Sequence, residues 1–416
     1  MISVKNAIGF DDYAVGVAWD YNAESPTLRR WFMAGGFEQT IDFDANPFNH
    51  LEPWKSMIRQ NQNDAGEVTA KFGDASYAED GSNGQVTVPI NSFYYRRWRD
   101  TANHRMIMAV SPKGINGFKR HPFCSRNGVL KPRINLGAFQ ASFYDVSGGA
   151  YADYYVGNAT PYTNGDGDTD GAPSGTVPDT TAGTGDKLAS VAGRFPLTNL
   201  RRANFRTLAT NRGSNWTQLD FLTREAVNHL YLVEFASLNG QAALGQGVCS
   251  KTWNSTYKAE KSGEATYSLT YPSYGITTDG LHPMCYRGIE NWWGNVWQWC
   301  DGINIKADHN PWIADHDYVD DKFESPYWDT GLTLATASGY ISDVHNTPDW
   351  ALLPSSVAGG GADKYFSDYY YQATGNRVAF VGGAWNYGGA RGPFVVSASD
   401  SSVTAAIHIG GRLLCT

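Results

Sequence analysis

The chain has 416 residues, of which 42% are hydrophobic and 18% charged, so it can build a core and is too weakly charged for a disordered chain. A formal net charge of −8 argues against a nucleic-acid binder and against docking on anionic lipid. No apolar run approaches the roughly 18 residues of a membrane span, and the first residues, MISVKNAIGF, lack the pattern of a secretory signal.

In chain order, residues 1–84 are rich in Asp, Asn and Trp and show little periodicity. This predicts a loop-rich opening segment for docking or oligomerisation. From residue 85 the apolar residues become regularly spaced. Val86, Val88 and Ile90 alternate with polar or small residues, which is typical of a strand. Residues 105–110 and 133–144 have the same character and are predicted to be further strands.

Residues 146–190 are dominated by Gly, Asp, Thr, Ala and Pro. Such a stretch buries too little apolar surface to offset its ordering entropy, so it is predicted to be a long surface insertion. Within it, Asp166, Asp168 and Asp170 alternate as in a calcium loop, but Val177 occupies the place of the bidentate Glu. A weak calcium site and a solvated acidic insertion both remain open.

Two helices are predicted after the insertion. The first covers residues 198–208. The second covers residues 217–237 and ends near Asn239 and Gly240, because gaps of three and four residues separate its apolar positions, Leu219, Leu222, Ala226, Leu230 and Val233. With short strands on both sides and no regular βαβ alternation, the order predicts an α+β fold and excludes a Rossmann fold or a barrel.

Motifs that signal catalysis are missing. The sequence has no phosphate-binding loop, nucleophile elbow or zinc-binding HExxH helix. Its nine histidines are scattered, and none of its five cysteines forms a CxxC pair, so free buried thiols are expected: Cys124, Cys249, Cys285, Cys300 and Cys415. The sequence therefore predicts no enzyme and no cofactor.

The most informative stretch is residues 288–302, where large apolar side chains surround Gly294 and Asn295. The glycine permits a close backbone approach, and the asparagine can bond to nearby main chain. Trp297 and Trp299 are expected to anchor a core. We interpret this stretch as scaffold.

The run GNVWQW at residues 294–299 is similar to the GNVWEW signature of the formylglycine-generating-enzyme branch of C-type lectin folds. The closing segment, residues 377–416, resembles that branch's pattern of GGxW followed by GxR. The resemblance implies, over residues 85–416, a C-type lectin fold with short twisted strands, two helices and long loops. Enzymes of this branch hold copper with a cysteine pair in the closing segment. Residues 384–411 contain no cysteine, so that activity is not expected.

The closing segment also resembles the variable region of diversity-generating-retroelement target proteins, in which chosen codons vary within a fixed frame. The frame here would be Gly382, Gly383, Trp385, Gly388, Gly392, Phe394, Ile409, Gly410, Gly411 and Arg412. The resemblance implies that the residues between them bind ligand: Ala384, Asn386, Tyr387, Ala390, Val395, Ser397, Ser399, Asp400, Thr404, Ala406 and His408. A face that must accept almost any side chain has to be exposed and free of packing contacts.

This resemblance implies a receptor-binding protein, a phage tail-tip adhesin of the virion, that recognises a protein or glycan receptor on a host cell. A homo-trimer would fit a fibre tip. The alternative is a bacterial surface or secreted adhesin with the same fold, and a remote one is an oxidase of the formylglycine-generating type. Calcium-dependent sugar binding is not expected, because the EPN, QPD and WND motifs of such lectins are absent.

Overall fold

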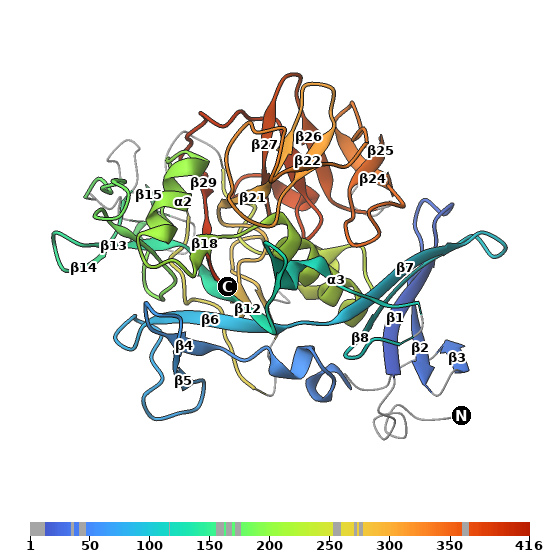
Figure 1. The fold of residues 1–416 in the computed structure, drawn as a ribbon, viewed down its shortest axis with the longest axis horizontal. Helices are drawn as coiled ribbons and strands as arrows, with labels where there is room; N and C mark the ends of the chain where they lie inside the picture. Colours follow the sequence, from blue (N-terminus) through green and yellow to red (C-terminus); the bar gives the residue numbers. More distant parts are fainter. Residues whose placement is uncertain are drawn as a thin grey trace.

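The computed structural model describes residues 13–34, 37–40, 47–115, 117–154, 162–163, 169–170, 176–252, 259–269, 273, 278–359 and 366–416. These residues form a mixed fold that is mostly sheet with few helices (Figure 1). No helix within the described ranges is long and apolar enough to cross a membrane.

Helix α3 (Phe221–Phe235) lies in the middle of the molecule, between the larger sheets (Figure 1). It begins where the Asp220 carboxylate accepts a hydrogen bond from the Thr223 amide at 2.8 Å, and it ends at Ala236, which has a left-handed φ of 49°. Every residue from Phe221 to Glu234 is buried. A helix that is covered on all sides also buries its charged residues, and these need partners: Glu234 forms an ion pair with Arg287.

The helix boundaries differ from those predicted. Residues 216–218 form strand β18 (Trp216–Gln218), which pairs with the C-terminal strand, so the helix starts later than residue 217. Asn239 does not end α3 but caps the next helix, α4 (Gly240–Leu244), by accepting from the Ala242 amide. The predicted helix over 198–208 is α2 (Arg202–Thr210).

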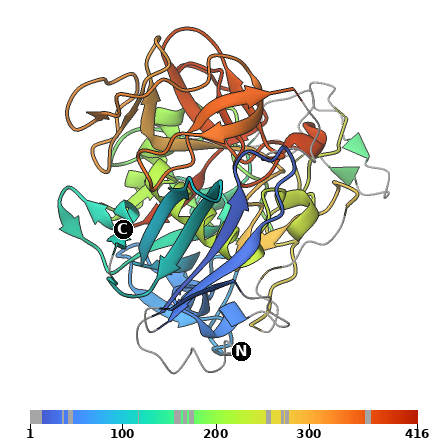
Figure 2. The same cartoon turned by 90° about the vertical axis from the view of Figure 1, so that its right-hand side faces the viewer.

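The opening strands of the chain belong to a six-stranded sheet in the order β3-β2-β1-β8-β7-β9, which faces the viewer in Figure 2. Its strands are β1 (Tyr13–Asp20), β2 (Arg29–Ala34), β3 (Phe37–Thr40), β7 (Tyr94–Asp100), β8 (Arg105–Ser111) and β9 (Lys119–Arg120). The described part of the opening segment therefore contains strands where loops were predicted. Its periodicity is hidden because β1 is buried on both faces, with Val15 and Val17 in one core and Ala14 and Ala18 in another.

A second six-stranded sheet has the order β18-β30-β12-β6-β4-β5. Its further strands are β4 (Gln60–Gln62), β5 (Val68–Lys71), β6 (Gln85–Asn91), β12 (Arg133–Gln140) and the C-terminal β30 (Arg412–Cys415). Because β4 pairs with β6 and β1 pairs with β8, strands from both sides of residue 84 share two sheets. The described structure does not divide at that residue.

The third sheet has nine strands and forms the upper part of Figure 1. Its path is β23-β22-β21-β27-β28-β26-β24-β25, and β29 pairs with β21. The strands are β21 (Trp297–Ile305), β22 (Pro311–Ile313), β23 (Trp328–Asp329), β24 (Gly339–Val344), β25 (Pro354–Ala358), β26 (Tyr369–Gln372), β27 (Arg377–Val381), β28 (Val396–Ala398) and β29 (Ile409–Gly410). This sheet carries most of the closing segment.

The predicted strand over 133–144 is two strands, because β13 (Ser142–Asp145) leaves the sheet of β12 and pairs with β14 (Ala150–Ala152) and β17 (Lys187–Ala189). The predicted insertion is therefore not a surface segment throughout: Leu188 and Ala189 are fully buried, whereas Val177 is 70% exposed. Shorter elements are β10 (Ser125–Arg126), β11 (Val129–Leu130), β15 (Tyr162–Thr163), β16 (Thr169–Asp170), β19 (Cys285–Tyr286), β20 (Ile289–Glu290), η1 (Pro47–His50), η2 (Trp54–Ser56), η3 (Pro122–Cys124) and η4 (Gly388–Ala390).

The Gly294–Asn295 turn is joined to its neighbours by buried hydrogen bonds. The Asn295 amide donates to Gln140 Oε1 at 3.0 Å and to the Glu260 carbonyl at 3.1 Å, and its oxygen accepts from the Glu260 amide at 2.7 Å. Gly294 has a φ of +80°, and a Cβ there would lie 2.8 Å from the Val248 carbonyl oxygen. Trp297 and Trp299 are buried beside this turn.

Arg412 is fully buried where three parts of the chain meet. Its guanidinium donates to Gln298 Oε1 at 2.6 Å and to four backbone carbonyls, those of Gly137, Ala138, Glu290 and Asn291, at 2.7 to 3.1 Å. Burial lowers the pKa of Arg412 to about 9, so the group is still charged at neutral pH. The residue thereby ties β30 to β12 and to the loop before GNVWQW.

Replacing Arg412 with alanine should lower the free energy of unfolding by at least about 3 kcal/mol, because the buried acceptors lose their donor. Urea denaturation followed by tryptophan fluorescence measures this. Arg120→Ala is the matched control, because Arg120 is exposed and its side chain bonds to the side chains of Ser92 and Tyr94. This substitution should lower the free energy of unfolding by no more than about 0.5 kcal/mol. Equal losses in the two variants would contradict the role assigned to Arg412.

Candidate ligand-binding surface

The candidate positions of the closing segment divide into buried and partly exposed sets. The ligand-binding prediction requires residues at the surface. Three candidates do not meet this requirement, because Ala384 and Val395 are fully buried and Ser397 is 2% exposed. Val395 packs in a core cluster, and Ser397 pairs with Tyr371 across two parallel strands. The other candidates are partly exposed: Asn386, Tyr387, Ala390, Ser399, Asp400, Thr404, Ala406 and His408.

Alternation along β28 does not separate the buried candidates from the partly exposed ones. Val395, Ser397 and Ser399 share one face of an extended segment, as the sequence predicts, but both faces of the segment are buried as far as Ala398, with Val395 in one core cluster and Val396 and Ala398 in another. Only Ser399, beyond the end of the strand, is partly exposed. Periodicity identifies residues that share a face and does not reveal whether that face is buried.

The partly exposed candidates meet aromatic side chains from other strands. Tyr387 lies 6.1 Å from His408 and 6.2 Å from Tyr371, measured between ring centroids, and Tyr371 lies 4.5 Å from Tyr369. Tyr369 in turn contacts Tyr340 of β24 at 5.3 Å. We call these five partly exposed side chains, Tyr340, Tyr369, Tyr371, Tyr387 and His408, the tyrosine surface.

Sequence reasoning missed three members of this surface. Tyr340, Tyr369 and Tyr371 lie before residue 377, outside the segment that the family resemblance singled out. A signal was present: in the run Tyr369-Tyr370-Tyr371, alternation predicts that the outer two share one face and Tyr370 the other. Tyr370 is indeed fully buried, and the outer two are partly exposed.

Arg391 holds the tyrosine surface from beneath. Its guanidinium carbon lies 4.1 Å from the ring centroid of Tyr387, 4.9 Å from that of Tyr371 and 5.1 Å from that of Trp297. Nη2 donates to the Tyr371 hydroxyl at 2.6 Å, and the side chain is 1% exposed. Cation–π attraction in a water-poor site is worth about 2 kcal/mol, so Arg391 fixes the positions of both tyrosines.

Glycine at position 383 makes room for this arginine. A Cβ on Gly383 would lie 2.1 Å from Arg391 Cδ, and the residue has a φ of +83°, which L side chains rarely adopt. Gly383, one of the predicted frame residues, is therefore coupled to the tyrosine surface through the packing of Arg391.

Polar side chains border the tyrosine surface. Ser399 hydrogen-bonds to Ser397 at 2.8 Å and donates to Asp400 at 2.7 Å, and Thr404 donates to the same carboxylate at 3.4 Å. Burial lowers the pKa of His408 to about 4, although the Asp400 carboxylate opposes the shift, so the imidazole is neutral at pH 7. Burial also raises the pKa of the Tyr387 hydroxyl, which stays protonated. The surface therefore offers uncharged rings, hydroxyls and an imidazole beside one carboxylate.

The backbone of residues 392–395 is clamped under this surface. Asp368 accepts a hydrogen bond from the Phe394 amide at 2.6 Å, and Arg224 of α3 donates to the carbonyls of Pro393 at 2.9 Å and Val395 at 3.2 Å. A Cβ on Gly392 would lie 2.4 Å from Asp368 Oδ1, so only glycine fits there. The closing segment thus rests on the central helix.

The cysteines do not offer thiolate chemistry. All five are buried and none is in a disulfide, and burial raises the pKa of each thiol, to about 11 for Cys285 and Cys415. In the part of the chain that the structure describes, no three His, Cys, Asp or Glu side chains come together as metal ligands. The weak calcium prediction at Asp166 and Asp168 lies outside the described residues, as does the side chain of Asp170.

Asp368 should make stability depend on pH. Burial raises its pKa to about 7 from an ordinary 3.8, so between these values the native state holds a proton that the unfolded state has lost. This contribution to the unfolding free energy is full below pH 4 and falls by about 1.4 kcal/mol per unit as pH rises to 7.

Asparagine has no carboxyl proton to lose, and its side-chain oxygen can still accept a hydrogen bond from the Phe394 amide. Asp368→Asn should therefore gain stability relative to the wild type as pH rises from 4 to 7, measured by urea denaturation at each pH. A difference that is constant over this range would mean that Asp368 has no raised pKa.

No family model matches the chain, and no curated protein matches it. Among solved structures, it is similar to the Major Tropism Determinant P3c variant, with 12% identity and a TM-score of 0.26 over 94% of this chain and 80% of that chain. The U1 variant has the same values, and the M1 variant has 11% identity and a TM-score of 0.26 over 96% of this chain and 82% of that one. A likeness of this strength carries no argument about the fold or the activity of this chain.

Proposed function

We propose that the chain is a receptor-binding protein that presents the tyrosine surface and the adjoining closing segment to a receptor on a host cell. The observation that carries the proposal is that rings from three separate strands and loops, those of Tyr340, Tyr371 and Tyr387 among them, gather beside polar candidates of the closing segment. Tyrosine suits such a surface because it offers a large amphipathic contact area and loses little conformational entropy on binding.

Pre-organisation supports the same function. Arg391 fixes the rings of the tyrosine surface, and Asp368 and Arg224 fix the backbone of residues 392–395. Because these groups are ordered before a ligand binds, binding costs less conformational entropy. Surface side chains can then change while buried ones keep the frame. We propose accordingly that the variable positions are the partly exposed candidates, and that Ala384, Val395 and Ser397 belong to the fixed frame.

The fold that we propose is the C-type lectin fold, on the strength of the GNVWQW run and the GGxW and GxR motifs. Each of these motifs supplies a fully buried residue, Asn295, Trp385 or Arg412, and the Trp385 backbone amide donates to the Asn295 carbonyl at 3.0 Å. A place at the tip of a phage tail and a trimeric assembly complete the proposal, because several weak sites acting together bind a cell surface tightly. The same surface would serve a bacterial adhesin.

We propose a binding role and not a catalytic one. His408 is neutral at pH 7, and its pKa of about 4 makes it a poor general base at that pH. The thiols are buried and protonated, so none is an activated nucleophile. An oxidase of the formylglycine-generating type would need a cysteine pair in residues 384–411, where there is none.

Sequencing the closing codons of this gene in a propagated population of its source should reveal concentrated substitution. The expected positions are Asn386, Tyr387, Ala390, Ser399, Asp400, Thr404, Ala406 and His408. Ala384, Val395, Ser397 and the glycine frame should stay constant because they are buried or sterically restricted. A closing segment as constant as the rest of the gene would remove the variable-surface proposal.

Binding of the fluorescently labelled protein to intact bacteria from the same source tests recognition directly. Tyr387→Ala should weaken binding about tenfold, which is typical of a central aromatic contact. Thr404→Arg should also weaken it, by adding bulk at the surface without removing a packing contact. Tyr21→Ala, a change in a partly exposed tyrosine beside β1, is the control and should bind normally. Unchanged binding in the first two variants, with normal thermal melting, would refute the assigned surface.

A further inference from the structure

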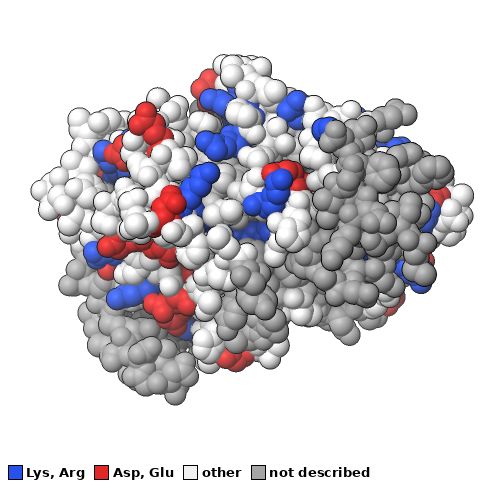
Figure 3. All heavy atoms as spheres, turned by 90° about the horizontal axis from the view of Figure 1, so that it is seen from below, with Lys and Arg blue, Asp and Glu red and all other residues white. Residues whose placement is uncertain are grey.

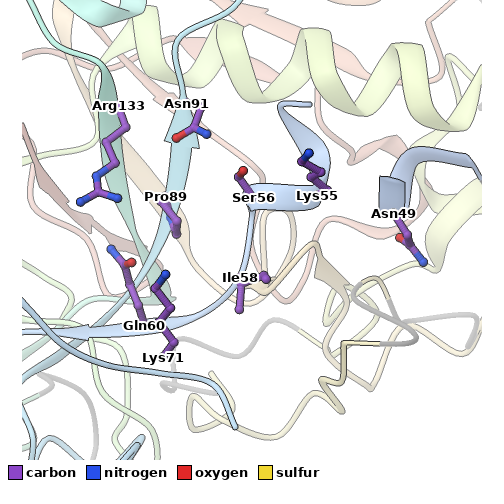
Figure 4. Close-up of a pocket in the computed structure, with 9 residues that line it drawn as sticks. All are labelled: Asn49, Lys55, Ser56, Ile58, Gln60, Lys71, Pro89, Asn91 and Arg133. Carbon is purple, nitrogen blue, oxygen red and sulfur yellow. The ribbon is translucent and has the colours of Figure 1, made fainter. Parts of the chain in front are cut away.

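A second candidate site lies at the opposite end of the molecule from the tyrosine surface, beside β4, β5 and β6 in the lower part of Figure 1. It is a pocket of about 440 Å³, within the range of small-molecule sites. Its lining residues are Asn49, Lys55, Ser56, Ile58, Gln60, Lys71, Pro89, Asn91 and Arg133 (Figure 4).

Strand register places the floor of this pocket on one face of the second sheet. Gln60 pairs with Lys71 on one side and with Thr87 on the other. Asn91, two alternations beyond Thr87, pairs with Arg133. Directly paired residues and alternate residues along a strand point to the same face, so Gln60, Lys71, Asn91 and Arg133 line the pocket from one face of the sheet, whereas Thr87 on that face is buried against Gln62. Figure 4 shows Arg133 extending from one side toward Lys71 and Gln60 on the other.

The lining is cationic and hydrogen-bonding. It holds three cations, Lys55, Lys71 and Arg133, and no carboxylate, in a chain whose net charge is −8. Lys55 has a partner in Glu52 at 3.4 Å, with half of its side chain exposed. Among the described residues, neither Lys71 nor Arg133 has a side-chain ion pair. Seen from this side, basic side chains gather across the middle of the face, whereas most acidic ones lie toward its left (Figure 3).

The remaining lining groups indicate what kind of anion would fit. Asn49 and Asn91 supply amides, which suit ligand hydroxyls as donors and acceptors. Gln60 and Ser56 are already engaged, because the Gln60 amide nitrogen donates to Asn135 Oδ1 at 3.0 Å and the Ser56 hydroxyl donates to the Glu52 carboxylate. Pro89 and Ile58 supply small apolar faces. Cations at two ends with amides between them match a ligand whose anionic groups are separated by hydroxyl-bearing atoms. Such a ligand is a sugar acid or a sugar phosphate.

We propose that this cationic pocket binds an anionic saccharide, that is, a sugar that carries carboxylate or phosphate groups. Arg133 and Lys71 bind one anionic group, Lys55 lies nearest the other, and the amides bind hydroxyls between them. The site is separate from the tyrosine surface and goes beyond receptor recognition by that surface.

Isothermal titration calorimetry on the full chain tests the pocket with four probes: digalacturonate for carboxylates, fructose 1,6-bisphosphate for phosphates, maltose as the neutral sugar, and tetraglutamate as an acidic peptide. At least one anionic sugar should bind at millimolar or lower concentration, more weakly at higher salt, and maltose should not bind. Arg133→Gln and Lys71→Gln should each weaken the binding about tenfold, the loss expected for a charged hydrogen bond. Lys306→Gln removes one exposed cation outside the pocket and should leave it unchanged.

Three results would overturn the proposal: no heat with either anionic sugar, binding of maltose as tight as theirs, or an affinity that neither pocket variant changes. Tighter binding of tetraglutamate than of both anionic sugars would also overturn it, in favour of an acidic peptide. The two proposed sites can fail separately. Arg133→Gln should keep normal cell binding, and Tyr387→Ala should keep normal sugar binding.

Discussion

The buried guanidinium of Arg412 is the contact on which the rest of the structure depends. Four backbone carbonyls and the Gln298 side chain accept its hydrogen bonds, and they come from β12, from the loop before GNVWQW and from β21. A buried charge is tolerated only when its donors are satisfied, so these three parts of the chain have to meet in one arrangement. The C-terminal strand is thereby held between β18 and β12 in its sheet.

Other buried side chains support the part of the closing segment that lies nearer the surface. Arg224 of the central helix and Asp368 hold the backbone of residues 392–395, and Arg391 holds the tyrosines above it. In this segment Ala384, Val395 and Ser397 are buried, whereas the candidate residues beside the tyrosine rings are partly exposed. A surface built in this way can change its contacts without changing its support, which is what a recognition surface needs.

The two proposed sites use different physics at opposite ends of the molecule. The tyrosine surface is largely uncharged at neutral pH and would bind by aromatic contact and hydrogen bonding. The cationic pocket is a hollow on one face of a sheet and would bind through charge. Three cations line this pocket in a protein of net charge −8, and Lys55 alone among them has a carboxylate partner, Glu52, among the described residues.

Sequence by itself determined the mixed fold class and the existence of helices α2 and α3, because these rest on local patterns such as helical spacing. It missed the opening strands because β1 is buried on both faces and shows no alternation. It could not separate Ala384, Val395 and Ser397 from the partly exposed candidates, since Ala384 and Val395 are buried by core residues from distant parts of the chain, such as Phe205 and Trp297. Only the tertiary structure brought Tyr340, Tyr371 and Tyr387 together at one site. It likewise brought Lys55, Lys71 and Arg133 together at the other. These residues are distant in the chain, and the pairing of strands decides which of them become neighbours.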